Sequence, residues 1–227
     1  MPAPIPFEKD SFTTGLGDLE ITFIGHGSLM MAFNQAILHV DPYGSQADYS
    51  LLPGADIILL THEHSDHMDP EAIRKIFKKD TQIVLTPTCQ GMLNQGIAMK
   101  NGDRLQVGAF NIEAVPAYNL IHRRPDGELF HKKGMGNGYI LSAGNLRVYI
   151  AGDTEDIPEL TAIKEIDIAF LPMNLPYTMT PEMVAHAAQM IMPKILYPYH
   201  YGKTKPSELM DLLGGEKGIE VRIRSLH

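Results

Sequence analysis

The chain contains one cysteine, Cys89, among 227 residues. A single thiol excludes an intramolecular disulfide and suits a reducing compartment, so we expect a buried structural thiol in a cytoplasmic protein. No segment approaches the ~20 consecutive apolar residues that a membrane span needs. The amino-terminal residues lack a basic start followed by an apolar run, so the sequence predicts neither a signal peptide nor a membrane partner.

Positive charge is scarce relative to negative charge. The chain has 19 Lys and Arg residues against 27 Asp and Glu residues, a formal net charge of -8, and its pI is near 5.6. Such a chain repels a phosphate backbone. The short runs Lys78-Lys79 and His131-Lys132-Lys133 are typical of a solvated surface. We therefore expect a small-molecule substrate and no nucleic-acid partner.

Apolar residues make up 44% of the chain, which is enough to form a full core in a single domain over residues 1–227. Strand-like runs form two meanders, within residues 19–40 and 104–150, and each meander is followed by pairs of a strand and a helix. This order predicts an α/β protein of the αββα sandwich class. Two mixed β-sheets would pack face to face, with the helices on the outside.

A helix is predicted to begin at residues 69–71, Asp-Pro-Glu. The aspartate can cap the first turn, the proline fits the first helical position, and the glutamate lies near the positive end of the helix dipole. Ile73, Ile76 and Phe77 follow at helical spacing and are expected to form the buried face of this helix.

The segment Thr61-His62-Glu63-His64-Ser65-Asp66-His67 brings three imidazoles and a carboxylate together directly after the strand-like run 56–60. Imidazole nitrogen and carboxylate oxygen are ligands of Zn, Mn and Fe. Histidines two residues apart on a tight loop can converge on one ion, and the Asp and His that follow can point to a second. A polar loop with a chance cluster of histidines is the alternative, but four ligand-type residues at a strand end favour a metal site.

This segment resembles the H-x-H-x-D-H signature of the metallo-β-lactamase fold hydrolases. Two later segments match the same family in the expected order, Ala151-Gly152-Asp153-Thr154 and Tyr199-His200-Tyr201. Residues 22–28 and 37–42 look most like the small single-domain branch that includes ascorbate-6-phosphate lactonase-like proteins. The resemblance extends over most of the chain and indicates the fold more strongly than the substrate.

The resemblance implies two divalent metal ions, with zinc expected and manganese or iron as alternatives. It assigns His62 and His64 to the first ion, assigns Asp66, His67 and His200 to the second, and makes Asp153 the bridge between them. Asp66 and Asp153 are then the expected catalytic carboxylates, and Asp66 is also a candidate proton shuttle.

One ligand of the resembled family is missing, because Asn119 stands where most relatives carry a histidine. An amide oxygen is a weaker and harder ligand than imidazole, so the first site is expected to bind weakly, to bind a harder ion, or to recruit a substitute. His122 and His131 are the candidate substitutes, and a surface position is the alternative for each. The glycine-rich end of this stretch, residues 134–138, is expected to be flexible, so the stretch could form a lid or a loop without function.

Two further residues are candidates for the surroundings of the metal ions. Asp41 follows the strand-like run 37–40, where a carboxylate can orient a ligand histidine, although a turn before Pro42 would also explain it. His26 lies between two glycines, which favours a pocket role, with a hydrogen-bonded turn as the alternative.

Three classes of function fit these observations. The first is a metal-dependent hydrolase that uses an activated hydroxide on a small ester, lactone, amide or phosphodiester. The second is an iron-dependent redox protein on the same fold, a class whose diiron branch typically carries glutamate where this chain has His64. The third is a metal-binding protein without hydrolytic activity, because of Asn119.

Overall fold

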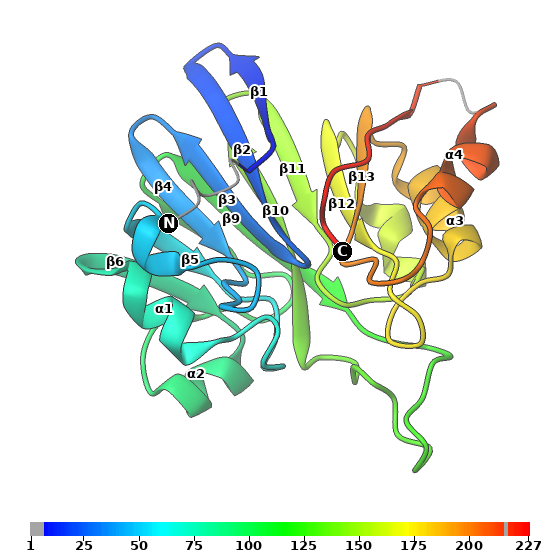
Figure 1. The fold of residues 1–227 in the computed structure, drawn as a ribbon, viewed down its shortest axis with the longest axis horizontal. Coiled ribbons are helices and arrows are strands. Elements are labelled where there is room, and N and C mark those ends of the chain that lie inside the picture. Colours follow the sequence, from blue (N-terminus) through cyan, green and yellow to red (C-terminus); the bar gives the residue numbers. More distant parts are fainter. Residues whose placement is uncertain (1–6, 216–217) are drawn as a thin grey trace, which may run out of the picture.

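The computed structural model describes residues 7–215 and 218–227. Two mixed β-sheets of seven strands each pack against one another, and helices lie outside both sheets (Figure 1). The predicted αββα class is confirmed. In the described part of the chain, no helix has both the length and the apolar character needed to cross a bilayer.

The first sheet follows the chain in order. Its strands are β1 (Lys9–Thr14), β2 (Gly17–Gly25), β3 (Ser28–Phe33), β4 (Ala36–Val40), β5 (Ala55–Leu59), β6 (Phe77–Leu85) and β7 (Ile97–Ala98). Strands β1 to β4 are antiparallel, whereas β5, β6 and β7 each run parallel to the preceding strand. The connections contain the 3₁₀ turn η1 (Tyr49–Leu51) and the helices α1 (Pro70–Ile76) and α2 (Pro87–Leu93).

The second sheet repeats this plan. Its strands are β8 (Arg104–Val107), β9 (Phe110–Ala117), β10 (Gly136–Ala143), β11 (Leu146–Ile150), β12 (Ile168–Pro172), β13 (Ile195–Tyr199) and β14 (Glu220–Val221). An antiparallel meander is again followed by parallel strands. The connections contain the 3₁₀ turn η2 (Pro158–Ala162) and the helices α3 (Pro181–Ile191) and α4 (Ser207–Leu213).

The core lies between the two sheets. Phe23 of β2 contacts Phe170 of β12 with ring centroids 6.3 Å apart, and Phe33 of β3 meets Phe110 of β9 at 5.8 Å. All four rings are buried. Aromatic pairs of this kind stabilise a core beyond the area they bury, by about 1 kcal/mol each, and here they fix one sheet against the other.

Three of the helices begin with the same device. Asp69, Thr86 and Thr180 each accept a hydrogen bond from a backbone N–H of the first helical turn, and each is followed by a proline. Such a cap is worth about 1 kcal/mol and fixes the residue at which the helix begins. The predicted start of α1 at Asp69 is therefore confirmed. This cap also fixes the carboxyl-terminal end of the loop that carries the histidine motif.

Two local predictions were wrong. Phe77 does not belong to the buried face of α1; it is 41% exposed and begins β6, because its backbone pairs with Ala55 of β5. Three of the five residues at the glycine-rich end, Gly136, Asn137 and Gly138, belong to β10, and only Gly134 and Met135 lie in the turn before it. At Gly138 a Cβ atom would lie 2.9 Å from the carbonyl oxygen of Ala151, so this glycine allows close packing of β10 against the end of β11.

Candidate metal centre and active site

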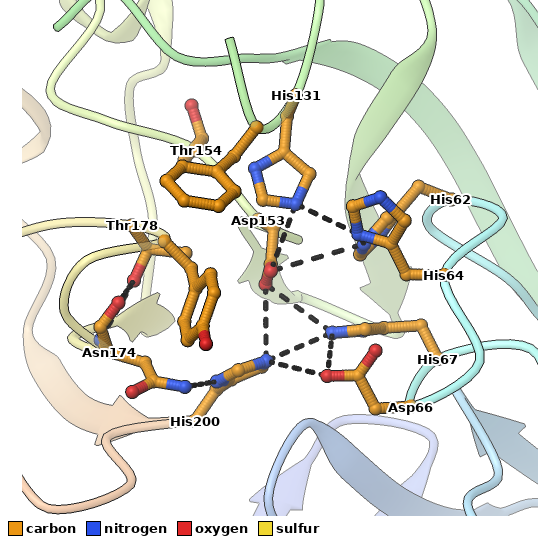
Figure 2. A network of polar contacts seen from close by, with 12 residues as sticks. His62, His64, Asp66, His67, His131, Asp153, Thr154, Asn174, Thr178 and His200 are labelled. Carbon is orange, nitrogen blue, oxygen red and sulfur yellow. Dashed lines mark hydrogen bonds and ion pairs between the residues drawn. The ribbon is translucent and has the colours of Figure 1, made fainter. Parts of the chain in front are cut away.

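The metal-motif segment 61–67 forms a tight loop between β5 and α1. The backbone N–H groups of His67 and Met68 both donate to the carbonyl of His64, at 3.0 and 2.8 Å. This single turn directs the side chains of His62, His64, Asp66 and His67 towards the loops that follow β11 and β13, where Asp153 and His200 lie (Figure 2).

Three histidines form the first half-site: His62, His64 and His131. The Nδ1 atom of His64 lies 3.1 Å from Nε2 of His62 and 3.2 Å from Nε2 of His131 (Figure 2). His62 and His131 are buried, and His64 is half-buried. Ligand nitrogens bound to zinc at about 2.0–2.1 Å in a tetrahedron would be about 3.3–3.4 Å apart, so this spacing fits one ion.

Asp66, His67 and His200 form the second half-site. The Nε2 atoms of His67 and His200 are 3.0 Å apart, and the Asp66 carboxylate lies 3.8 and 3.6 Å from them. His26 extends this group by contacting Asp66 at 3.0 Å. Together these four residues offer ligand atoms within 4.8 Å of one another.

Asp153 lies between the two half-sites. Its carboxylate is 3.2 Å from His131 and 3.9 Å from His62 on one side, and 3.5 and 3.6 Å from His67 and His200 on the other. The carboxylate is buried, yet its Oδ1 atom has no hydrogen-bond partner in the described part of the chain. Since an unpartnered buried oxygen is costly, this atom fits a site built for cations.

Burial and nearby charges shift the pKa values of the histidines in opposite directions in the two half-sites. Burial lowers the pKa of His62 well below its usual value and also lowers that of His64, so both imidazoles are neutral at pH 7. Burial also disfavours protonation of His67, but the carboxylates of Asp153 and Asp41 outweigh this effect and raise its pKa to about 9. His67 therefore carries a proton at pH 7 in the metal-free protein.

Asp41 holds His67 in place. Its Oδ2 atom accepts a hydrogen bond from Nδ1 of His67 at 2.8 Å and another from the Thr61 hydroxyl at 2.6 Å, while its Oδ1 accepts from the Thr61 backbone at 2.8 Å. All three residues are buried. A carboxylate that accepts from the far ring nitrogen leaves Nε2 free for a metal and fixes the ring plane.

Asn119 holds His131 in the same manner. The Oδ1 atom of Asn119 accepts from Nδ1 of His131 at 2.6 Å and from its backbone N–H at 2.8 Å. The amide is held in turn by the buried carboxylate of Glu155, which accepts from its Nδ2 at 2.9 Å. Asn119 thus lies one step away from the half-site and turns Nε2 of His131 towards it.

His122 lies outside the cluster. Its Nδ1 atom lies 2.7 Å from Glu155, which also accepts from the backbone N–H groups of Leu120, Ile121 and His122 at 2.6 to 2.7 Å. This buried carboxylate was missed by sequence reasoning, although it stands only two residues after Asp153. It fixes the start of the segment that carries His131.

Three residues around the second half-site have left-handed backbone conformations: His26 with φ 54°, Asp41 with φ 43° and His200 with φ 47°. The carbonyl oxygen of His26 accepts a hydrogen bond from the His200 N–H at 3.1 Å, and the centroids of the two rings lie 3.7 Å apart. Non-glycine residues with positive φ are uncommon and cluster at functional sites.

Two cavities open onto the cluster. One of about 390 Å³ is lined by His62, His64 and His131 and by the segment 124–132. The other, about 380 Å³, is lined by Asp66, His200, Asn174 and Tyr177. Asp153 lines both. The segment between β9 and β10, which projects from the sheets at the bottom of Figure 1, forms the wall of the first cavity.

Comparison with known proteins identifies the family. The family model for the Beta-lactamase superfamily domain matches residues 20–200. The chain belongs to the beta-lactamase superfamily. A UPF0173 metal-dependent hydrolase from Lysinibacillus sphaericus is 31% identical over 201 residues, which cover 84% of this chain and 88% of the relative. A relative from Enterococcus faecalis with the same name is 32% identical, over 81% of this chain and 86% of its own length.

Two solved structures have the same fold as this chain. The first is the crystal structure of a protein from Parabacteroides distasonis named as a metal-dependent hydrolase, which is 53% identical to this chain and superposes with a TM-score of 0.93. The match covers 97% of this chain and 100% of that one. Igni18, a metallo hydrolase from Ignicoccus hospitalis, has 22% identity and a TM-score of 0.76, covering 92% and 95%. This second likeness supports the fold alone.

The structure brings together every residue that superfamily resemblance assigned to a metal: His62, His64, Asp66, His67, Asp153 and His200. Of the candidate substitutes, His131 enters the cluster, whereas Asn119 and His122 lie outside it. Asp41 and His26 contact ligand candidates directly. Their roles as ligands or positioning residues stay predictions, as does the likeness to ascorbate-6-phosphate lactonase-like proteins.

Proposed function

We propose that this protein is a metal-dependent hydrolase that acts on a small molecule with two divalent ions. The observation that carries the proposal is the position of Asp153, a buried carboxylate with an unpartnered Oδ1, between two groups of ring nitrogens. His62, His64 and His131 would hold one ion, and Asp66, His67 and His200 would hold the other. Asp153 would contact both.

His131 bears on the strength of the first half-site. With Asn119 as a ligand, this half-site would have been weak; with His131 it offers three imidazole nitrogens, which is a common zinc-binding set. We therefore favour zinc, with manganese or iron as alternatives. The same position of His131 argues against a protein that has lost its activity through Asn119.

The bound ions would supply a nucleophile from water at neutral pH and polarise the substrate's carbonyl or phosphoryl oxygen. Hydrolysis adds the hydroxyl of water to the acyl or phosphoryl centre, breaks the bond to the leaving oxygen or nitrogen, and delivers a proton to that atom. We assign this proton transfer to Asp66, whose carboxylate lines the 380 Å³ cavity and is held by His26. Contacts with His200 and His26 keep its pKa low despite burial, so it begins as a base.

The size of the cavities supports a small substrate, because sites of about 300–1,000 Å³ accommodate single small molecules. A single-domain organisation, a cytoplasmic location, and the absence of nucleic-acid and membrane partners remain predictions. The buried Cys89, whose pKa burial raises to about 11, is consistent with a structural thiol.

The test combines metal analysis with a substrate panel. Protein purified without chelator or nickel resin would be analysed by plasma mass spectrometry and assayed on an ester, a lactone, an amide and a phosphodiester. About two equivalents of zinc or manganese, with hydrolysis that a chelator removes and the metal restores, would support the proposal. Iron with no hydrolysis would favour the redox class. Protein without metal and without hydrolysis would overturn the assignment.

A further inference from the structure

Arg124 lies at the entrance of the proposed metal centre. Its Nη2 atom is 3.2 Å from Nε2 of His64, and the guanidinium lies over the ring of Phe130, 5.1 Å from its centroid. Arg124 lines both cavities that open onto the cluster. Among the described residues it is the only Lys or Arg that lines the 380 Å³ cavity.

The backbone holds Arg124 in this position. Its N–H donates to the carbonyl of Glu128 at 2.7 Å, the N–H of Gly127 donates back to its carbonyl at 2.9 Å, and Arg123 pairs with Leu129. These contacts close residues 123–129 into a narrow turn. The cation–π contact with Phe130 further restricts the plane of the guanidinium.

The guanidinium of Arg124 is not paired with a carboxylate in the described part of the chain, although Glu63, Asp126 and Glu128 also line the 390 Å³ cavity. Within residues 7–215 and 218–227, Arg124 has no ion-pair partner, whereas Lys132 of the 390 Å³ cavity is paired with Glu128. Among the residues that the structure describes, the carboxylates that line the 380 Å³ cavity are Asp66 and Asp153, and both are proposed metal ligands. With cations bound to them, this cavity has no negative group left to face Arg124.

The contact between Arg124 and Nε2 of His64 would be lost when His64 binds a metal, which would free the guanidinium for another acceptor. His64 presents Nδ1 to the first half-site. A neutral imidazole that binds a metal through Nδ1 carries its proton on Nε2, and Nε2 then offers Arg124 no acceptor. Among the described residues, the guanidinium then keeps the cation–π contact with the Phe130 ring and a weak hydrogen bond to the Phe130 carbonyl, at 3.4 Å.

We propose that Arg124 binds an oxyanion of the substrate, so that the enzyme prefers small carboxylate- or phosphate-bearing molecules over neutral ones. The planar fork of a guanidinium binds either group through two parallel hydrogen bonds. The anion would occupy the 380 Å³ cavity, which Arg124 lines together with the proposed ligands and with Asn174 and Tyr177. This inference rests on the proposed function and names its substrate class.

The experiment compares Arg124→Gln and Arg124→Lys with Arg123→Gln as matched control. Arg123 is also exposed but lines neither cavity, and its Nη1 donates to the Gly127 carbonyl. Hydrolysis would be measured for phenyl acetate, 4-acetoxybenzoate and 4-acetoxybenzylphosphonate. Binding of benzyl alcohol, benzoate and benzylphosphonate would be measured separately by calorimetry on the metal-loaded proteins, so that one readout does not depend on activity.

Arg124→Gln should raise KM and Kd for at least one anionic series about tenfold to a hundredfold, the effect of losing a charged hydrogen-bonding partner. The neutral series should not change, Arg124→Lys should recover part of the loss, and Arg123→Gln should match the native protein. The carboxylate and phosphonate arms identify which oxyanion is preferred.

Equal behaviour of Arg124→Gln and Arg123→Gln on both anions would overturn the inference, as would an equal loss on neutral and anionic compounds. The proposed function can fail separately. If the native protein binds the anions through Arg124 but hydrolyses nothing in any panel, the anion site stands and the hydrolase assignment falls.

Discussion

The two half-sites are built differently, although both start from the same loop. The second half-site takes Asp66 and His67 from the short loop between β5 and α1, and His200 from the residue that follows β13. The first half-site takes His62 and His64 from the β5 loop but its third histidine from the long connection between β9 and β10. A ligand at a strand end is fixed by the sheet, whereas a ligand on a long connection can be replaced by another residue of that connection.

Replacing Asp153 should weaken metal binding at both half-sites, because this carboxylate contacts both. Asp153→Asn is expected to lose both metal equivalents and to reduce hydrolysis on the order of a thousandfold, since metal-ion stabilisation is worth several kcal/mol. Plasma mass spectrometry and steady-state rates measure this. Asp156→Asn, three residues further on and bonded to His186, is the control that should keep both ions. Retention of both ions by Asp153→Asn would contradict the bridging role.

Replacing His131 should separate the half-sites. His131→Ala is expected to lose about one metal equivalent and to retain the ion of the second half-site, because the substitution removes a ring nitrogen from the first half-site alone. His122→Ala provides the control, since His122 lies on the same connection but contacts Glu155 instead of the cluster. Should His122→Ala lose an ion while His131→Ala keeps two, the assignment of the third ligand would be wrong.

The amides next to the half-sites allow a finer comparison. Asn119 accepts from His131, and Asn174 lies 3.2 Å from Nδ1 of His200. Asn119→Ala should weaken the first half-site about tenfold to a hundredfold, the usual effect of removing a group that orients a ligand, and Asn174→Ala should act on the second instead. Competition with a chromophoric chelator would measure both affinities. An effect of Asn119→Ala on both half-sites alike would indicate a general loss of structure.

Proton uptake should also distinguish the half-sites. At pH 7 a metal must displace the proton of His67, whose pKa is raised to about 9, whereas His62 and His64 are already neutral. Through His67, the metal affinity of the second half-site should therefore rise about tenfold from pH 7 to pH 8 and level off above about pH 9, a pH dependence that His62 and His64 do not add to the first half-site. Calorimetry in buffers of different ionisation enthalpy would count the released proton. Asp41→Asn removes a carboxylate that raises this pKa and should move the dependence to lower pH.

The fold was largely predictable because its signals are local. The signals that predicted it, the alternating apolar runs and the cap and proline at the start of α1, each act within a few residues. Strand β1 was missed because its exposed edge position leaves little apolar pattern. Phe77 was misplaced because helical spacing continues past the residue at which the chain pairs with β5.

The second half-site and the bridge could be predicted from motifs at strand ends, but the third histidine of the first half-site could not. His122 and His131 share the same polar stretch, and the choice between them depends on the path of the chain. That path is set by Glu155, whose carboxylate accepts hydrogen bonds from the N–H groups of residues 120–122. Further along the chain, the backbone N–H of His131 donates to the side chain of Asn119, which brings His131 back to the site. No local pattern reports such a contact between distant segments.

The left-handed backbone at His26, Asp41 and His200 has a consequence for protein engineering. Only glycine adopts this conformation freely, and other residues in it cost about 1–2 kcal/mol each. A search for thermostable variants that scores local conformation alone would select glycine at all three positions. Such a search would remove the proposed ligand His200, the His26 side chain that contacts Asp66, and the Asp41 carboxylate that contacts His67. At these residues a gain in heat resistance would therefore oppose the retention of chemistry.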